Sequence, residues 1–222
     1  MSTASFLFPL FLTLKVAVLA TIASLTMGVA AAYLLGRTAF PGRDWLDAVL
    51  TLPLVMPPTV LGYYLIVVIG RRGFLGPFLE DVFGVSLMFT WEGAAVAASV
   101  VSFPLVFKSA RAALEGVERN LEDAARTMGQ SELAVFFRVS LPLAWRGILA
   151  GTLLAFARAM GEFGATLMVA GNLPGRTQTM SMAVYSAVQA GDKTLANLLT
   201  AVISVVCVLI LVITGKLAKP KT

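Results

Sequence analysis

The sequence predicts an all-α protein, a polytopic transmembrane helical bundle with about five spans. Hydrophobic residues make up 58% of the 222 residues and charged residues only 13%, whereas soluble domains carry about a quarter charged residues. Long apolar runs recur along the chain, and its length leaves room for five or six spans of roughly 20 residues each. No internal repeat or detachable soluble segment interrupts them, so residues 1–222 form one transmembrane domain.

The first predicted span covers residues 8–35. Residues 16–35 carry no charge, and the stretch before them is apolar apart from Lys15, which must snorkel to the surface or face protein. No Lys or Arg precedes Lys15, and the apolar run is longer than the core of a signal peptide. We therefore expect a membrane span here and not a cleaved leader.

The second predicted span, residues 48–70, contains three prolines. Pro53 and the pair Pro57 and Pro58 lack the N–H groups that a continuous helix needs. Because unsatisfied carbonyls are costly in hydrocarbon, the break should face protein or a wet cavity. It is either a bend facing a pore or gate, or a packing kink.

Three further spans follow. Residues 88–107 are rich in Ala, Ser and Val, which allow close helix packing. Residues 147–171 and 195–215 form the fourth and fifth spans. Between these two, the weakly amphipathic segment 180–189 is predicted to form a helix that could lie at the membrane surface.

The long polar segment 120–142 is predicted to form a helical hairpin between the third and fourth spans. Asn120 is a suitable N-cap, and Glu122 and Asp123 place negative charge in the first turn, where the helix dipole favours it. Gly129 is the residue type that ends a helix in a left-handed conformation.

The second helix of this hairpin is expected to start at Ser131 as its N-cap. It should run through Val139 and stop at Leu141 and Pro142, because proline breaks a continuing helix.

The distribution of positive charge predicts the orientation of the five spans. One side would carry only Arg71, Arg72, Arg176 and Lys193. The other side would carry Arg37, Arg43, Lys108, Arg111, Arg119, Arg126, Arg138, Arg146, Lys216, Lys219 and Lys221. The second side is therefore cytoplasmic, with the N-terminus outside, the C-terminus inside and the hairpin in the cytoplasm.

Arg158 and Glu162 are charged residues deep in the fourth span. Their spacing of four residues puts them on one helix face, where they can pair. A lone charge there would cost about 2.5–3.5 kcal/mol, so both should face protein or water. They form either a structural pair or part of an anion path, in which Arg158 helps the anion and Glu162 orients Arg158.

Basic residues outside the spans have two open interpretations. Arg71 and Arg72 on the outer side could attract an anion or dock a binding protein, or could simply be solvated. The lysines after residue 215 are explained by anchoring near anionic membrane lipid. The net charge of +5 therefore does not require a nucleic-acid partner.

The sequence offers no catalytic machinery. It has no histidine, one cysteine in an apolar run, and no nucleophile–base arrangement. It also has no P-loop pattern for binding nucleotide phosphates. We expect no enzyme activity, no metal and no cofactor bound by this chain.

The hairpin carries a motif with a specific spacing. The sequence Asp123-Ala124-Ala125, three residues, Gly129, nine residues, Val139, one residue, Leu141-Pro142 resembles the EAA signature of bacterial ABC importer permeases. It departs from that signature with Asp in place of Glu at the first position and Val in place of Ile. In that family the segment docks on the ATPase subunit; an interfacial hairpin with no partner is the simpler alternative.

Longer stretches resemble the membrane subunit of bacterial molybdate ABC importers. The similarity runs from about residue 40 to 179 and is strongest over 102–179, which includes SFPLVFKSARAALEGVERNLEDAARTMG and LAFARAMGEFGATLMVAGNLPGRTQT. Tungstate and sulfate or thiosulfate permeases are near relatives, and an amino-acid importer is a further alternative within the ABC class. A secondary transporter is the main rival outside it.

The resemblance implies a type I permease in the bacterial cytoplasmic membrane. It would pair with a second copy of itself and with two ATPase subunits that bind ATP and Mg²⁺. An external binding protein would deliver the oxyanion, and transport would proceed by alternating access.

The expected site residues fall into two groups. The ATPase-coupling residues are Glu122, Asp123, Ala124, Ala125, Met128, Gly129, Leu141 and Pro142. The residues assigned to the translocation path are Pro57, Pro58, Arg158 and Glu162. A bulky charged residue at Ala125 or Gly129 is expected to uncouple transport while leaving membrane insertion intact.

Overall fold

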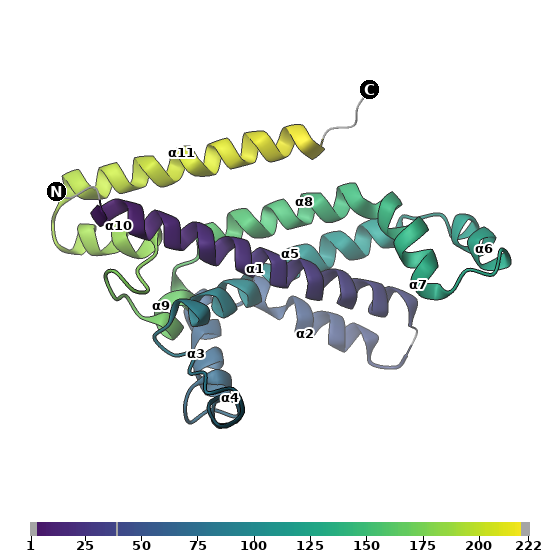
Figure 1. The fold of residues 1–222 in the computed structure, drawn as a ribbon, viewed down its shortest axis with the longest axis horizontal. Coiled ribbons are helices and arrows are strands. Elements are labelled where there is room, and N and C mark those ends of the chain that lie inside the picture. Colours follow the sequence, from purple (N-terminus) through teal and green to yellow (C-terminus); the bar gives the residue numbers. More distant parts are fainter. Residues whose placement is uncertain (1–3, 39, 219–222) are drawn as a thin grey trace.

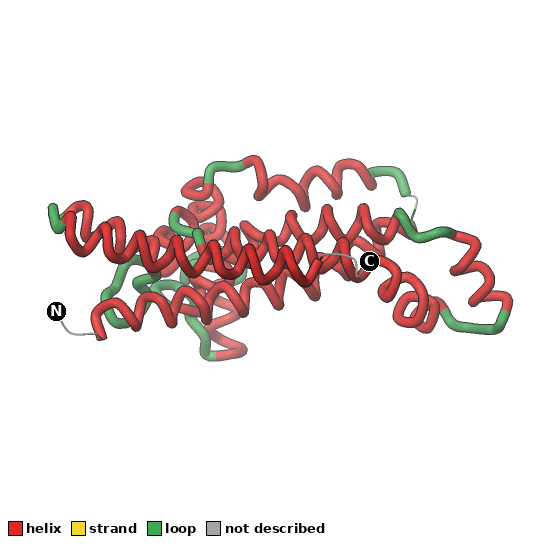
Figure 2. The backbone as a smooth tube through the Cα atoms, turned by 90° about the horizontal axis from the view of Figure 1, so that it is seen from above, coloured by secondary structure: helices red, strands yellow, loops and turns green. Residues whose placement is uncertain are grey.

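The computed structural model describes residues 4–38 and 40–218, which form helices joined by loops (Figures 1 and 2). The elements are α1 (Ala4–Arg37), α2 (Arg43–Val55), α3 (Pro58–Ile69), α4 (Gly76–Phe83), α5 (Trp91–Glu115), α6 (Arg119–Thr127), α7 (Glu132–Val135), the π-helix η1 (Phe136–Ser140), α8 (Leu141–Met160), α9 (Gly164–Ala170), α10 (Met180–Gln189) and α11 (Lys193–Ala218).

The long helices run along one axis of an elongated bundle. In Figure 1, α1, α5 and α11 run from left to right, whereas α2 and α8 run in the opposite direction. The N-terminal end of α1 and the α10 region lie at the left end of the bundle, and α6 and α7 project from the right end. The segment with α6 and α7 and the N-terminal end of α1 therefore lie at opposite ends of the bundle.

The centre of the bundle consists of α1, α5 and α8. Their contact surfaces are rich in small residues, and Ala94, Ala98, Ala110, Ala144 and Ala159 are all buried. A Cβ atom added at Gly147 of α8 would lie 2.6 Å from the Cβ of Ala113 on α5, closer than real Cβ contacts allow. Small side chains thus permit the close helix approach that is typical of membrane bundles.

Among the described residues, four helical segments are long and apolar enough to cross a membrane. They are Leu7–Arg37, Trp91–Glu115, Glu132–Met160 and Lys193–Val212. The pair α2 and α3 makes a fifth if it is taken as one broken span, because its two helices are bent by 119° after Val55. The five-span prediction thus corresponds to four long helices and one broken pair.

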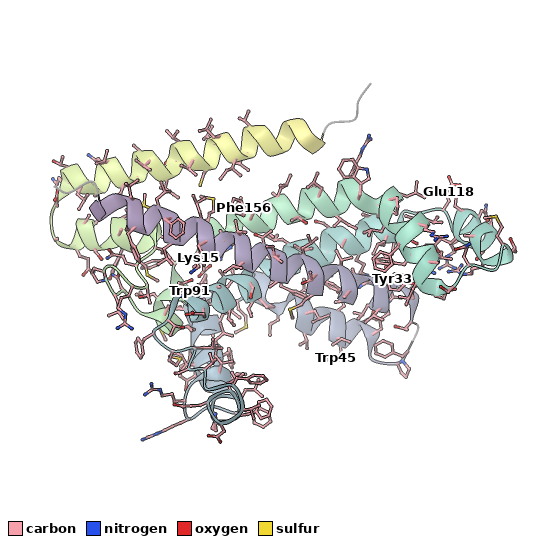
Figure 3. The ribbon with its side chains drawn as sticks, viewed as in Figure 1. Lys15, Tyr33, Trp45, Trp91, Glu118 and Phe156 are labelled. Atoms are coloured by element: carbon pink, nitrogen blue, oxygen red, sulfur yellow. The ribbon has the colours of Figure 1, made fainter. Side chains whose placement is uncertain are left out.

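Lys15 faces protein, which is the second of the two alternatives for this charge. Its ammonium nitrogen lies 3.2 Å from the centroid of the Trp91 ring at the start of α5 (Figure 3). An ammonium over an indole face is stabilised by the electrostatic attraction of the ring.

Helix α10 has the bounds that the sequence predicts, but its apolar face is covered by protein. Met180, Met182 and Ala183 are buried, and the helix packs against α11 and the start of α1. The backbone N–H of Met180 donates a hydrogen bond of 2.8 Å to the Thr13 hydroxyl. These contacts tie α10 to the bundle.

The first turns of α2 are fixed to α5 by charge. Asp47 accepts a hydrogen bond of 2.5 Å from Lys108 and pairs with Arg111, and Arg111 also pairs with Glu115 at 2.9 Å. No residue of α2 is buried within the chain, and these ion pairs, with that of Arg43 and Glu115 at 3.3 Å, link the helix to the bundle.

Candidate functional site

The segment 120–142 contains a helix, a turn and a second helix, as expected. The turn follows α6 at Gly129, whose φ of 79° is a left-handed conformation that glycine adopts without strain. The amide of Gln130 donates to the carbonyl of Ala125, closing the end of α6. Ser131 caps the second helix, because its hydroxyl accepts a hydrogen bond of 3.3 Å from the amide of Ala134.

The two ends of the predicted hairpin differ from the prediction. Helix α6 begins at Arg119 with Glu118 as its N-cap and no side-chain cap, so Asn120 lies inside the helix and the predicted cap is wrong. The predicted stop at Leu141 and Pro142 is also wrong, since one continuous helix runs over Glu132–Met160. The π-helical turn η1 precedes Pro142, and π-type bonding to carbonyls five residues back lets the chain pass the proline.

Helix α6 has two faces with different roles. Glu122 and Ala125 are buried against the rest of the molecule. Leu121, Ala124 and Met128 form an exposed apolar stripe, and Met128 is 74% exposed. We call these three residues the outer stripe. An exposed apolar row on an otherwise polar helix is typical of a contact surface.

This orientation corrects the expected effect of two substitutions. Ala125 is only 5% exposed, so a bulky charge there would disturb the hairpin itself. Any other residue at Gly129 would be strained by its positive φ, although a Cβ there would meet no neighbour within 4 Å. Both substitutions would therefore disturb the folding of the hairpin, whereas Ala124 is exposed and free of this constraint.

A charge cluster around the buried Glu122 and Ser140 holds α6 to the end of α1. The Glu122 carboxylate pairs with the Arg37 guanidinium and accepts a hydrogen bond of 2.5 Å from the Ser140 hydroxyl. Arg37 also lies 3.4 Å from the Glu132 carboxylate, and the hydroxyl of Tyr33 donates to the Glu132 carbonyl. These contacts join α1, α6, α7 and η1 into one unit; Figure 3 labels Tyr33 at this junction.

Arg126 links the two arms of the hairpin from the outside. It donates to Glu132 at 2.6 Å and to Asp123 at 2.6 Å. Hydrogen bonds to Glu132 and then to Asp123 raise the pKa of Arg126 above its usual value. A polar hollow of about 590 Å³ lies beside this network and opens between α1, α5 and α6.

The four residues assigned to a path lie at two helix breaks that touch one another. The fourth predicted span is interrupted, since α8 ends at Met160 and α9 begins at Gly164. A Cβ added at Gly164 would lie 2.9 Å from the Cβ of Pro58, so the second break abuts the break at Pro57 and Pro58. Helices α3 and α9 then pack along each other.

Arg158 and Glu162 form the predicted pair at this place. Arg158 donates a hydrogen bond of 2.7 Å to one carboxylate oxygen of Glu162, and the other oxygen accepts 2.9 Å from the amide of Ala165 in the first turn of α9. The Glu162 side chain is 2% exposed, whereas that of Arg158 is 34% exposed. Glu162 therefore connects α8 with α9, and Arg158 retains an accessible face.

Comparison with known proteins identifies the family. The profile of the family described as "Binding-protein-dependent transport system inner membrane component" matches residues 24–221. The chain belongs to this family. The family and the apolar helices make this inner membrane component a multi-pass membrane protein.

Individual relatives of this inner membrane component agree with that assignment. It is 53% identical over 178 residues, or 80% of its length and 78% of the relative's, to the molybdenum transport system permease protein ModB of Escherichia coli strain K12. It is 36% identical over 199 residues, or 90% and 72%, to the sulfate transport system permease protein CysT of Salmonella typhimurium. A chain of the inward-facing MetNI methionine ABC transporter has the same fold, with a TM-score of 0.74, 17% identity and 98% of both chains covered.

Sequence reasoning missed several residues of the hairpin unit in this membrane component. Arg37, Tyr33 and Ser140 were not assigned to it, although Arg37 pairs with Glu122 across 85 positions of the sequence. The signal in the sequence was the spacing of Glu122 and Ala125, which lie three residues apart and therefore share one face of α6. In the structure this face is buried. A carboxylate on a buried face needs a cationic partner.

Neutralising Glu122 is expected to weaken the hairpin of this membrane component. In Glu122→Gln, the side chain can still accept a hydrogen bond but loses its charge attraction to Arg37, which should lower the free energy of unfolding by about 1–3 kcal/mol. Thermal unfolding in detergent measures this loss. Glu118→Gln is the matched control, because Glu118 is exposed and makes no cap bond, and equal shifts in both variants would contradict the prediction.

Proposed function

We propose that this chain is the permease subunit of an ATP-driven, binding-protein-dependent importer that moves molybdate into the cytoplasm. The choice of molybdate as the substrate rests on the 53% identity to a molybdenum transport permease, against 36% to a sulfate transport permease. The adjacent broken helices with one accessible guanidinium support an anionic substrate, since arginine binds tetrahedral oxyanions through paired hydrogen bonds.

Energy for transport comes from partner proteins in this proposal. The sequence carries no phosphate-binding loop, so two ATPase subunits would bind ATP and Mg²⁺ and hydrolyse the nucleotide. A second copy of the chain would complete the translocation path, and an external binding protein would deliver the oxyanion. The chain itself would bind no cofactor or nucleic acid.

The outer stripe is the surface that we assign to ATPase docking. Leu121, Ala124 and Met128 are exposed and apolar, and the motif residues Asp123 and Gly129 border them. Leu133 on α7, at 68% exposure, is a further exposed apolar residue of the hairpin. Ala124 allows close approach of a partner because its side chain is short.

Force from the ATPases would reach the helix breaks through a rigid connection. The second arm of the hairpin continues without interruption into α8, from Glu132 to Met160, and the first arm is clamped to α1 through Glu122 and Arg37. Movement of the hairpin would therefore shift α8 and the break beyond it. ATP binding can favour an outward-open state only if the ATPase pair binds that state more tightly.

The translocation path in this scheme passes the two breaks. Pro57 and Pro58 interrupt one span, and Glu162 holds Arg158 beside the other interruption. Arg158 would contact the passing anion, and Glu162 would set its orientation. The N-terminus would lie outside, and the hairpin and C-terminus would lie in the cytoplasm, by the distribution of positive charge.

Uptake into vesicles tests this function. The chain is reconstituted with its ATPase and binding protein, and labelled molybdate is followed with and without ATP inside. We expect uptake only when all components and ATP are present, with tungstate competing more strongly than sulfate. Full uptake without the ATPase would instead indicate a secondary transporter, and stronger competition by sulfate would assign the chain to sulfate transport.

A further inference from the structure

A second hollow lies at the end of the bundle opposite the hairpin. It has a volume of about 770 Å³ and opens between the end of α3, the segment that precedes α5, and the loop between α9 and α10. Figure 1 shows that this loop and the start of α5 lie far from α6 and α7.

The charges that line this hollow are all positive. Arg71, Arg72 and Arg176 line it, and no carboxylate is among its lining residues. Its remaining wall is largely apolar and includes Tyr63, Met88 and Phe89 among others. All three arginines are exposed. They come from two loops about a hundred residues apart, so the fold brings them together.

These arginines lack the carboxylate partner that six other described cations have. Arg37, Arg43, Lys108, Arg111, Arg126 and Arg158 each pair with a carboxylate. Within residues 4–38 and 40–218, none of the three arginines of the hollow has such a partner. Arg71 makes one side-chain hydrogen bond, of 3.3 Å, to the Ser86 hydroxyl.

One side of the hollow includes Phe89, which has an unusual backbone conformation and is bonded to α9. Phe89 has a φ of 58°, which is rare for a residue other than glycine, and its amide donates 3.0 Å to the carbonyl of Val169 at the end of α9. A Cβ added at Gly171 would lie 3.0 Å from the Phe89 ring. The wall of the hollow is thus attached to the helix that follows the Arg158–Glu162 pair.

We propose that this hollow is an entry site that holds a tetrahedral divalent oxyanion transiently before it enters the translocation path. The inference rests on the proposed function and adds a site to it. Three guanidinium groups without carboxylate partners supply the positive charge that a divalent anion needs. Each offers N–H donors in a planar fork that matches two oxygens of a tetrahedral oxyanion.

The position favours weak and reversible binding. The arginines are exposed to solvent, so their attraction is screened by salt and is much smaller than in a buried site. A concave surface of one charge sign also raises the local concentration of an oppositely charged ligand. Both properties suit a site that receives an anion and releases it again.

A docking surface for an acidic region of the binding protein is the rival explanation for the same arginines. The concave shape favours a small anion over a protein edge, whereas the positive charge without a carboxylate would suit either occupant. The experiment therefore measures anion binding and protein docking separately.

The test uses the permease–ATPase complex in lipid nanodiscs. Broadening of the molybdenum NMR line of molybdate reports weak binding without binding protein or ATP. A triple variant, Arg71→Gln with Arg72→Gln and Arg176→Gln, removes the proposed site. Lys193→Gln is the matched control, because Lys193 is another exposed cation on the predicted outer side that does not line the hollow.

We expect the triple variant to lose the line broadening and to lower ATP-driven uptake about tenfold, with unchanged affinity for the binding protein. Arg176→Lys should give an intermediate effect, since it keeps the charge but loses the fork. Unchanged broadening in the triple variant, or the same loss in Lys193→Gln, would overturn the site. Loss of binding-protein affinity with broadening retained would assign the arginines to protein docking.

These outcomes separate the site from the proposed function. If wild-type vesicles show no ATP-driven oxyanion uptake while the triple variant alone loses broadening, the anion site stands and the transport proposal fails. If uptake is normal in the wild type and in the triple variant, the transport proposal stands and the entry site fails.

Discussion

Replacing Ala124 by arginine is expected to reduce ATP-driven uptake about a hundredfold while the chain remains folded. Ala124 is exposed at the middle of the outer stripe, between Leu121 and Met128. A long charged side chain there would separate the docked surfaces and bury an unpaired charge, which costs about 3 kcal/mol of association. No contact within the chain needs to change.

The measurement has three parts. Uptake into vesicles gives the loss of transport, co-purification with the ATPase gives the loss of docking, and thermal unfolding in detergent reports the fold. Ala112→Arg is the matched control, because Ala112 is an exposed alanine on α5, outside the hairpin. A complex that co-purifies normally and transports at the wild-type rate with Ala124→Arg would remove the docking role from this surface.

Ala125→Arg provides an opposite case on the same helix. Ala125 is buried in the hairpin, so arginine there should lower the melting temperature as well as transport. If docking rather than folding decides the effect of Ala124→Arg, only the Ala125 variant should show a reduced melting temperature.

Local sequence patterns predicted those features of the fold that depend on neighbouring residues. Apolar runs indicated the long helices, Gly129 marked the turn, and Pro57 and Pro58 marked a break that is present. Each of these follows from side-chain polarity or from the backbone restrictions of single residue types.

Features that depend on distant contacts could not be predicted in this way. The break between α8 and α9 is stabilised by the hydrogen bond from the Ala165 amide to Glu162, a contact that the hydropathy of residues 147–171 does not reveal. Pro142 does not end the helix, because the hydrogen bonds of the π-helical turn before it reach carbonyls five residues back. The helix can therefore continue although proline has no N–H to donate. The ion pair that holds α6 to α1 depends on Arg37. From the sequence, Arg37 was interpreted only as one of the positive charges that mark the cytoplasmic side.

The largest expected loss of stability comes from removing Glu162. The Glu162→Ala variant leaves the Arg158 guanidinium without its partner and the amide of Ala165 without its acceptor, both in an apolar part of the bundle. Breaking a buried ion pair from one side costs about 3–5 kcal/mol. Arg158 is 34% exposed, so we expect about 3 kcal/mol, measured by denaturant or thermal unfolding in detergent.

A neutral pair separates the structural role from the transport role. Arg158→Met keeps most of the length of the side chain without its charge, and Glu162→Gln keeps an oxygen that can accept from the Ala165 amide. The double variant therefore contains no unpaired charge, and its unfolding free energy should return to within about 1 kcal/mol of the wild type.

Transport by this double variant decides between the two interpretations of the pair. If Arg158 contacts the passing anion, uptake should remain about tenfold below that of the wild type even though stability has recovered, because the guanidinium is absent. A structural pair requires only that both charges be satisfied, so wild-type uptake by the neutral pair would remove Arg158 from the path. Because stability and uptake are measured on the same variants, a folding defect cannot be mistaken for the loss of an anion contact.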